Sequence, residues 1–156
     1  MRLWHVDLIP YLPKSQLLAQ WRELNSIYAK QDRHILINYI YDYNRHYLKA
    51  YLDKVITEMR RREIKIRDFS KYDAYFSGMQ NGFAGKEIVG LETGLRFKEH
   101  DDEYLRICYY NLKEKYMRGQ KDFSYPTWVK LYYFCKNILE KEKTNGLISE
   151  GVMQGF

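Results

Sequence analysis

The stretch YLKAYLDKVITEMRRR, residues 47–62, has the strongest helical pattern in this chain of 156 residues. Its apolar residues recur three and four positions apart, which predicts an amphipathic helix over about residues 45–63. They are Tyr47, Leu48, Tyr51, Leu52, Val55, Ile56 and Met59. The run from Arg60 to Arg62 places cations at the negative end of the helix dipole, where positive charge is stabilising.

Three other segments have the same period, and they cover about residues 15–30, about 101–117 and a stretch that starts near Pro126. Ser15 is the candidate cap of the first segment, and the acidic residues 101–103 suit the first turn of the second. We therefore expect an all-α fold, a single compact helical domain of about four main helices with a long glycine-containing loop.

The remaining segments are less regular. Residues 65–100 contain five glycines, which predicts a long loop and a candidate ligand-contacting surface. Residues 34–41, HILINYIY, fit a strand and a buried helix equally well. The last residues resemble a loosely held tail, so we divide the chain into a helical domain, residues 1–142, and a tail, residues 143–156.

The charge and the aromatic content favour an acidic partner. The chain has 26 lysines and arginines against 20 aspartates and glutamates, which gives a formal net charge of +6. Nucleic acid and an anionic membrane surface both fit this balance. The 16 tyrosines, 7 phenylalanines and 3 tryptophans suit base stacking, although most of them are expected to build the core.

The cysteines and the apolar runs indicate a compartment. Cys108 and Cys135 match neither a disulfide framework nor a zinc spacing. No apolar run approaches the roughly 18 residues of a membrane-spanning helix, and the chain opens with no signal-peptide pattern. We expect a soluble protein of the reducing cytoplasm, with no membrane partner.

The common catalytic motifs are absent from the sequence. The histidines show no paired spacing, and the acids of EHDDE, residues 99–103, are ordinary at a helix start, so no metal site is predicted. There is no phosphate-binding loop and no nucleophile elbow. The basic residues of 60–67 and the pair Arg33 and His34 support a nucleic-acid surface when they are taken with the aromatic residues.

Arg22 and Glu23 flank the apolar stripe of the first predicted helix from opposite sides. A carboxylate at the position of Glu23 is partly shielded from water, where its pKa rises and proton transfer becomes useful. Periodicity alone nevertheless favours two ordinary residues at the rim of a helix.

Four sequence segments in the same order resemble the pyrimidine dimer DNA glycosylase family, the endonuclease V-like enzymes. They are MRLWH at residues 1–5, LLAQWREL at 17–24, YLDKVITEMRRR at 51–62 and YPTWVKLYY at 125–133. The resemblance covers most of residues 1–135. The opening residues and EHDDEYLRICYYNLKEK at 99–115 are more similar to a little-characterised bacterial branch of the family.

This resemblance implies a compact all-α DNA repair enzyme that cleaves the glycosidic bond at a pyrimidine dimer and then the adjoining backbone, as an AP lyase. It needs no metal and no cofactor. Its nucleophile is the α-amine of the chain, here that of Met1, and Glu23 matches the catalytic carboxylate. A free α-amine has a pKa of about 7.7 to 8.0, so a useful fraction is neutral at cellular pH and attacks the sugar C1′.

One departure from the family concerns the first residue. The phage enzyme of this family loses its initiator methionine to expose a threonine, whereas Arg2 is too large for the usual removal. We expect Met1 to remain and to occupy the place of that threonine, with a one-residue insertion before Gln16.

The resemblance and the basic runs together assign the DNA-binding residues. They are Arg2, Arg22, Lys30, Arg33, His34, Trp128 and Lys130. Arg22 matches a family arginine that holds phosphate near the lesion, whereas Trp128 suits the DNA-facing end of the last helix and a core position equally well. Ser26 stands where the family has another DNA-binding arginine, and Lys30 or Arg33 is expected to compensate for it.

The expected partner is double-stranded DNA with damaged bases, with no obligate protein partner. Two other interpretations stay open at this point. The chain is either a catalytically silent nucleic-acid-binding module of the same fold, or a helical interaction protein whose charge serves only solubility.

Overall fold

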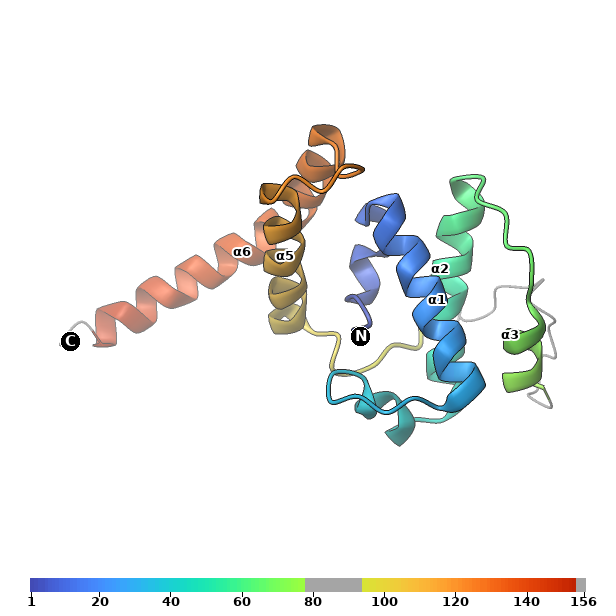
Figure 1. Ribbon diagram of the computed structural model, residues 1–156. Helices are drawn as coiled ribbons and strands as arrows, with labels where there is room; N and C mark the ends of the chain where they lie inside the picture. The colour runs from blue at the N-terminus through green and yellow to red at the C-terminus, as the bar shows by residue number, and fades with distance from the viewer. Residues whose placement is uncertain (78–93, 154–156) are drawn as a thin grey trace.

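The computed structural model describes residues 1–77 and 94–153, with side chains as far as Lys141. This part of the chain is helical and contains no strand, which confirms the predicted all-α fold (Figure 1). The α-helices are α1 (Lys14–Lys30), α2 (Arg45–Arg61), α3 (Ser70–Tyr75), α5 (Asp102–Met117) and α6 (Tyr125–Met153). Two short 3-10 helices are η1 (Val6–Tyr11) and η2 (Asn38–Asp42).

Helices α1, α2, α5 and α6 are the four that the apolar period predicts, within a few residues at their starts. The predicted cap of α1 is wrong, because the helix begins after Pro13 and Ser15 lies inside it. Ser15 instead donates two hydrogen bonds to the Asp122 carboxylate, from its backbone amide at 2.6 Å and from its hydroxyl at 2.9 Å. Asp101 caps α5 by accepting from the backbone amide of Tyr104.

The two segments without a clear helical period, residues 34–41 and 65–100, contain short helices. Residues 34–41 form neither a strand nor a buried α-helix but a turn followed by η2, and Ile35 is 85% exposed. Helix α3 lies within the predicted loop 65–100, and the glycine-rich part of that loop, residues 78–93, lies outside the described residues.

The backbone of α6 continues to Met153, across the expected boundary between residues 142 and 143, and extends away from the other helices (Figure 1). Because the side chains after Lys141 are not described, the division into a domain and a tail stays a prediction.

The N-terminal segment runs between the two groups of helices, α1 to α3 on one side and α5 with α6 on the other (Figure 1). Its η1 packs against both α2 and α6. Leu3, Leu8 and Leu12 in and beside η1 are fully buried, so the segment is part of the hydrophobic core. The helical period gives no signal for η1, because six residues with Pro10 inside them are too short to show one.

Long-range hydrogen bonds hold this segment against the C-terminal half. The backbone amide of Val6 donates to Nδ1 of His100 at 3.0 Å, and the Tyr104 hydroxyl donates to the Leu3 carbonyl. The other ring nitrogen of His100 lies 2.7 Å from the Tyr39 hydroxyl. Burial, helped by the charges of His5 and Arg96 and opposed by that of Asp7, lowers the pKa of His100 to about 3, so the ring is neutral in the folded protein.

None of the helices in the described part of the chain is long and apolar enough to cross a membrane.

Candidate active site

Helix α1 presents Arg22 and Glu23 to different environments. Its buried face is formed by Leu17, Gln20, Leu24, Ile27 and Tyr28. Glu23 lies beside this face and is half-buried, whereas Arg22 is exposed. Successive residues of an α-helix point about 100° apart, so neighbours at the rim of a stripe can differ in this way.

The Glu23 carboxylate contacts a buried amide. Nε2 of Gln20, one turn earlier in α1, donates to Oε2 of Glu23 at 3.2 Å and to the backbone carbonyl of Arg2 at 3.1 Å. The N-terminal segment therefore lies directly over this part of α1. Met1 itself is half-buried and packs against the core.

The charge of the Met1 amine affects the pKa of the Glu23 carboxyl. Burial raises the pKa of the Glu23 carboxyl above its ordinary value, and three nearby groups oppose that rise. They are the positive charge of the Met1 amine, the backbone amide of Arg2 and the guanidinium of Arg22. A carboxyl group whose pKa is raised by partial desolvation is a stronger base than an exposed one, which suits it to proton transfer.

A basic groove of about 490 Å³ lies beside Arg22, between α1 and the segment that leads into α3. Its cationic residues are Arg22, Lys30, Arg67 and Lys71, and Asp68 is its acid. Oδ1 of Asp68 already accepts from the backbone amide of Ser70 at 2.8 Å. Four cations against one carboxylate suit the phosphates of a nucleic-acid strand.

Arg67 and Lys71 were not assigned to the site from the sequence. Arg67 belongs to the basic run that follows α2, and Lys71 comes four residues later. The basic run indicates a positively charged surface but not where that surface lies. Only the packing of α3 on α1 brings Arg67 and Lys71 to Arg22. Ser26 lines the same groove, so these two cations lie beside the position at which the resemblance implies a further arginine.

Two other arginines of the basic run have a structural role. Arg61 and Arg62 both bind the buried carboxylate of Glu58, at 2.5 Å and 2.7 Å. Although burial alone would raise it, these hydrogen bonds hold the pKa of Glu58 below its ordinary value. Within the basic run 60–67, Arg61 and Arg62 therefore stabilise α2, whereas Arg67 lines the groove.

Two candidates to compensate for Ser26 are placed differently. Lys30 lines the groove with Ser26. The guanidinium of Arg33 lies 4.1 Å from the ring centre of Tyr41, and the backbone amide of His34 donates to Asn38. Arg33 and His34 are both exposed in the turn after α1, next to Lys30.

Arg2 turns toward α5, where its guanidinium lies 5.8 Å from the ring centre of Tyr104. It is half-buried, and its backbone carbonyl and amide both face the Gln20 and Glu23 side chains. Arg2 therefore contributes its backbone to the candidate site.

Trp128 packs between α5 and α6. Its ring is stacked on Tyr116 with a centroid distance of 4.9 Å and an interplanar angle of 5°, and it lies 5.6 Å from the ring of Tyr109. Of the two positions that the sequence left open for Trp128, these contacts favour packing within the helical domain.

Lys130 lies at the opposite end of α1 from Lys30. It lines a separate pocket of about 330 Å³ together with Lys14, Arg61 and Arg62. Lys14 and Lys30 are the first and last of the 17 residues of α1, so they lie about 24 Å apart along the helix at a rise of about 1.5 Å per residue. The structure therefore separates Lys130 from the groove that contains Lys30.

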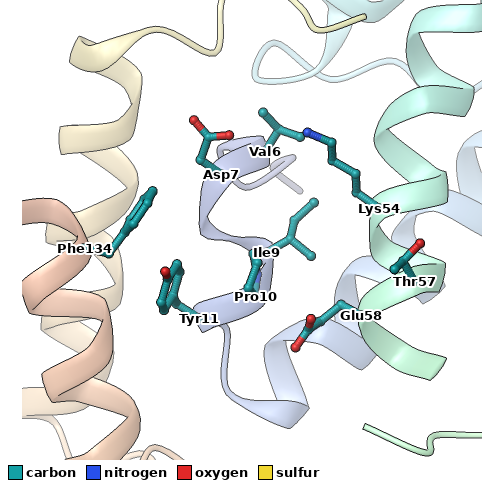
Figure 2. Close-up of a pocket in the computed structure, with 9 residues that line it drawn as sticks. All are labelled: Val6, Asp7, Ile9, Pro10, Tyr11, Lys54, Thr57, Glu58 and Phe134. Carbon is teal, nitrogen blue, oxygen red and sulfur yellow. The ribbon is translucent and has the colours of Figure 1, made fainter. Parts of the chain in front are cut away.

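An apolar pocket of about 460 Å³ lies between η1, α2 and α6 (Figure 2). Val6, Ile9, Pro10, Tyr11 and Phe134 form its apolar wall. Three of its polar side chains already have partners: Glu58 binds Arg61 and Arg62, Thr57 donates to the Asp53 carbonyl, and Asp7 binds Arg96. This pocket contains none of the residues that the sequence assigns to the site.

The cysteines are free and buried. Burial raises the pKa of the Cys135 thiol to about 12 and raises that of Cys108 as well, so neither is an activated nucleophile. Among residues 1–77 and 94–141, no group of three histidine, cysteine or acidic side chains is arranged to hold a metal ion.

Comparison with known protein families gives a match over the N-terminal part of the chain. Residues 1–71 match the family model described as pyrimidine dimer DNA glycosylase, which supports the family that the sequence resembles. The matched residues include Met1, Glu23 and all of the cations that line the groove beside Arg22. No match was found among curated proteins or among solved structures.

Proposed function

We propose, because residues 1–71 match the family model described as pyrimidine dimer DNA glycosylase, that this protein cleaves the glycosidic bond at pyrimidine dimers in double-stranded DNA and then cleaves the backbone as an AP lyase. The α-amine of Met1 is the nucleophile and Glu23 is the catalytic carboxylate. The observation that supports these roles is that the positive charge of the Met1 amine lowers the pKa of the Glu23 carboxyl, and both residues lie within the matched segment.

The chemistry needs only these two groups. The neutral amine forms a bond to C1′ as the glycosidic bond breaks, and the base leaves with the bonding electrons and takes up a proton. Loss of a proton from nitrogen and opening of the sugar ring give an imine. The imine draws electrons from C2′, so that a base removes the 2′ proton and the 3′ phosphate leaves by elimination.

Glu23 has a defined part in this sequence. An ionised carboxylate beside C1′ stabilises the positive charge that develops on the sugar and on the imine nitrogen. The raised pKa of Glu23 makes it a stronger base than an exposed glutamate, which suits it to take the 2′ proton.

The groove beside Arg22 is the proposed path of the DNA backbone. Arg22, Lys30, Arg67 and Lys71 line it on the side of α1 next to Glu23. Phosphate contacts from these residues fix the register of the duplex without reading its sequence, as suits a protein that recognises damage. A damaged pair costs less to unstack than an intact pair, so the lesion itself contributes to selectivity.

The test is covalent trapping on a duplex with one abasic site. Mass spectrometry first establishes that the purified chain starts at Met1. Borohydride is expected to reduce the imine and leave protein bound to DNA, and a two-residue extension before Met1 is expected to abolish this product.

Glu23→Gln is expected to lower the rate of strand cleavage by at least about 100-fold. The matched control is Glu103→Gln, which makes the same change at an exposed position on α5 and should cleave normally. Normal trapping by the extended chain, or normal cleavage by Glu23→Gln, would exclude the assigned mechanism.

The silent DNA-binding module is the second candidate, and the groove favours it independently of the amine. Its cations bind phosphate whether or not Met1 is reactive. This candidate predicts salt-sensitive binding to intact and damaged duplexes alike, with no borohydride-trapped product.

A further inference from the structure

Gln20 is a polar residue in the core of the protein, with only 1% of its surface exposed. A buried amide is costly unless its hydrogen-bonding groups are satisfied. Oε1 of Gln20 accepts from the backbone amide of Trp4 at 2.8 Å and from the Tyr51 hydroxyl at 2.9 Å. Nε2 donates to the Arg2 carbonyl and to Glu23, so the amide makes four hydrogen bonds.

These bonds join two parts of the candidate site. Two of them fix the backbone of residues 2–4, which carries the α-amine of Met1 one residue away. A third fixes one oxygen of the Glu23 carboxylate, in the next turn of the same helix. One rigid side chain therefore links the segment that bears the amine to the side chain of Glu23.

Tyr51 of α2 binds both the Gln20 amide and the backbone of the N-terminal segment. Its hydroxyl lies 2.9 Å from Oε1 of Gln20 and 2.7 Å from the backbone carbonyl of Trp4. Tyr51 is 2% exposed, so its ring is fixed by packing. The N-terminal segment is thus clamped between α1 and α2 by two buried side chains.

We infer, on the basis of the proposed function, that Gln20 is the positioning residue that sets the Met1 amine against the Glu23 carboxylate, with Tyr51 as its support. Gln20 does not touch the reacting atoms. It acts by holding Oε2 of Glu23 and the Arg2 carbonyl on the same amide nitrogen, so the two reacting groups keep one geometry. Its role is distinct from a general packing role because an apolar side chain of the same size cannot replace it.

The first test measures the reaction. Gln20→Met keeps the size of the side chain and removes all four hydrogen bonds, and Gln20→Glu keeps the shape but removes both donors. Each is expected to slow imine trapping by about 10-fold to 100-fold, because small displacements of reacting groups cost this much. Affinity for a duplex with a non-cleavable abasic analogue should change less than about twofold, so the loss is in kcat and not in KM.

The matched control is Gln16→Glu, one turn earlier in α1. Gln16 bonds to Gln120, away from the N-terminal segment, and is half-buried. This variant should trap normally. If Gln20→Glu does not fold, Tyr51→Phe removes one bond to the Gln20 amide and one to Trp4, and is expected to give a smaller loss of trapping.

A second measurement does not depend on DNA. In the free protein, NMR titration gives the pKa of Glu23, and a small acylating reagent reports the reactivity of the Met1 amine. Gln20→Met should raise the pKa of Glu23, because a hydrogen bond donated to the ionised form is lost, and should change the acylation rate. Gln16→Glu should leave both values as in the wild type.

The two measurements separate the possible outcomes. If the wild type forms no trapped product but Gln20→Met changes both values, the proposed enzymatic function fails and the positioning by Gln20 stands. If the folded Gln20 variants leave the Glu23 pKa, the amine reactivity and the trapping rate unchanged, Gln20 is a structural residue only and the inference is overturned.

Discussion

At the scale of single residues, Glu23 is placed where a carboxylate is useful but costly. It is half-buried in the rim of α1, and burial raises its pKa more than the neighbouring positive groups lower it. The charged form of this side chain is therefore less favourable in the folded protein than in the unfolded chain. Shifted pKa values of this kind are typical of the titratable groups of active sites.

Glu23→Gln is expected to raise the free energy of unfolding at pH 8. A carboxyl whose folded pKa lies above its unfolded value destabilises the fold once it ionises, so stability is lost as pH rises from the ordinary value of 4.5 through the raised folded value. Urea denaturation at pH 8 and at pH 4 measures the effect. The free energy of unfolding should rise at pH 8 and rise less at pH 4, whereas the exposed control Glu103→Gln should show no rise at pH 8. A variant less stable than the wild type at pH 8 would contradict it.

At the scale of elements, the packing of α3 on α1 builds the groove from residues that are distant in the sequence. Arg22 and Lys30 come from α1, whereas Arg67 and Lys71 come from the segment around the start of α3. Aromatic contacts hold this pair of elements together, among them Trp21 against Phe69 and Tyr28 against Tyr72. The position of α3 thus sets how many cations a phosphate can meet.

Arg67→Ala and Lys71→Ala are each expected to weaken binding to intact and damaged duplexes to the same extent. Each lost phosphate contact should lower the slope of log K against log salt by about 1. Both residues are exposed, so the free energy of unfolding should change by less than about 0.5 kcal/mol. Fluorescence anisotropy from 50 to 200 mM salt measures the slope. Lys121→Ala, an exposed lysine between α5 and α6, is the control, and equal slopes for all three variants would remove the groove from the DNA path.

At the scale of the whole molecule, the hydrogen bonds of His100 join the N-terminal segment to the C-terminal half and make the fold sensitive to acid. The ring accepts from Val6 while it is neutral, and its pKa is lowered to about 3. The unfolded chain takes up a proton near pH 6.5 and the folded protein does not. Stability is therefore complete above about pH 6.5 and is lost as pH falls toward 3.

The expected loss from His100 between pH 7 and pH 5 is about 2 kcal/mol. His100→Gln keeps a hydrogen-bonding side chain but does not titrate, so its stability should fall less over the same interval. Urea denaturation at both pH values measures the difference. His46→Gln, which changes an exposed histidine at the start of α2, should keep the slope of the wild type. An unchanged slope in His100→Gln would mean that another group causes the acid sensitivity.

The long helices can be predicted from the sequence because their apolar residues recur three and four positions apart over several turns. Those over 14–30, 45–61 and 102–117 agree closely with the expectation, whereas η1 and η2 are too short to show a period. For Glu23, the helical wheel correctly gives a position at the rim. The partial shielding and raised pKa that this position predicts are also confirmed. The wheel cannot place the N-terminal segment beside Glu23, because the position of that segment depends on contacts with His100 and Tyr104.

Residues 3 and 6 of this protein are held by residues 104 and 100, so the segment around η1 gains these partners only after about 100 further residues have been synthesised. At a synthesis rate of about 5 to 20 residues per second, roughly 5 to 20 seconds pass before those partners leave the ribosome. During that interval the segment around η1 lacks the two hydrogen bonds that hold it against the C-terminal half.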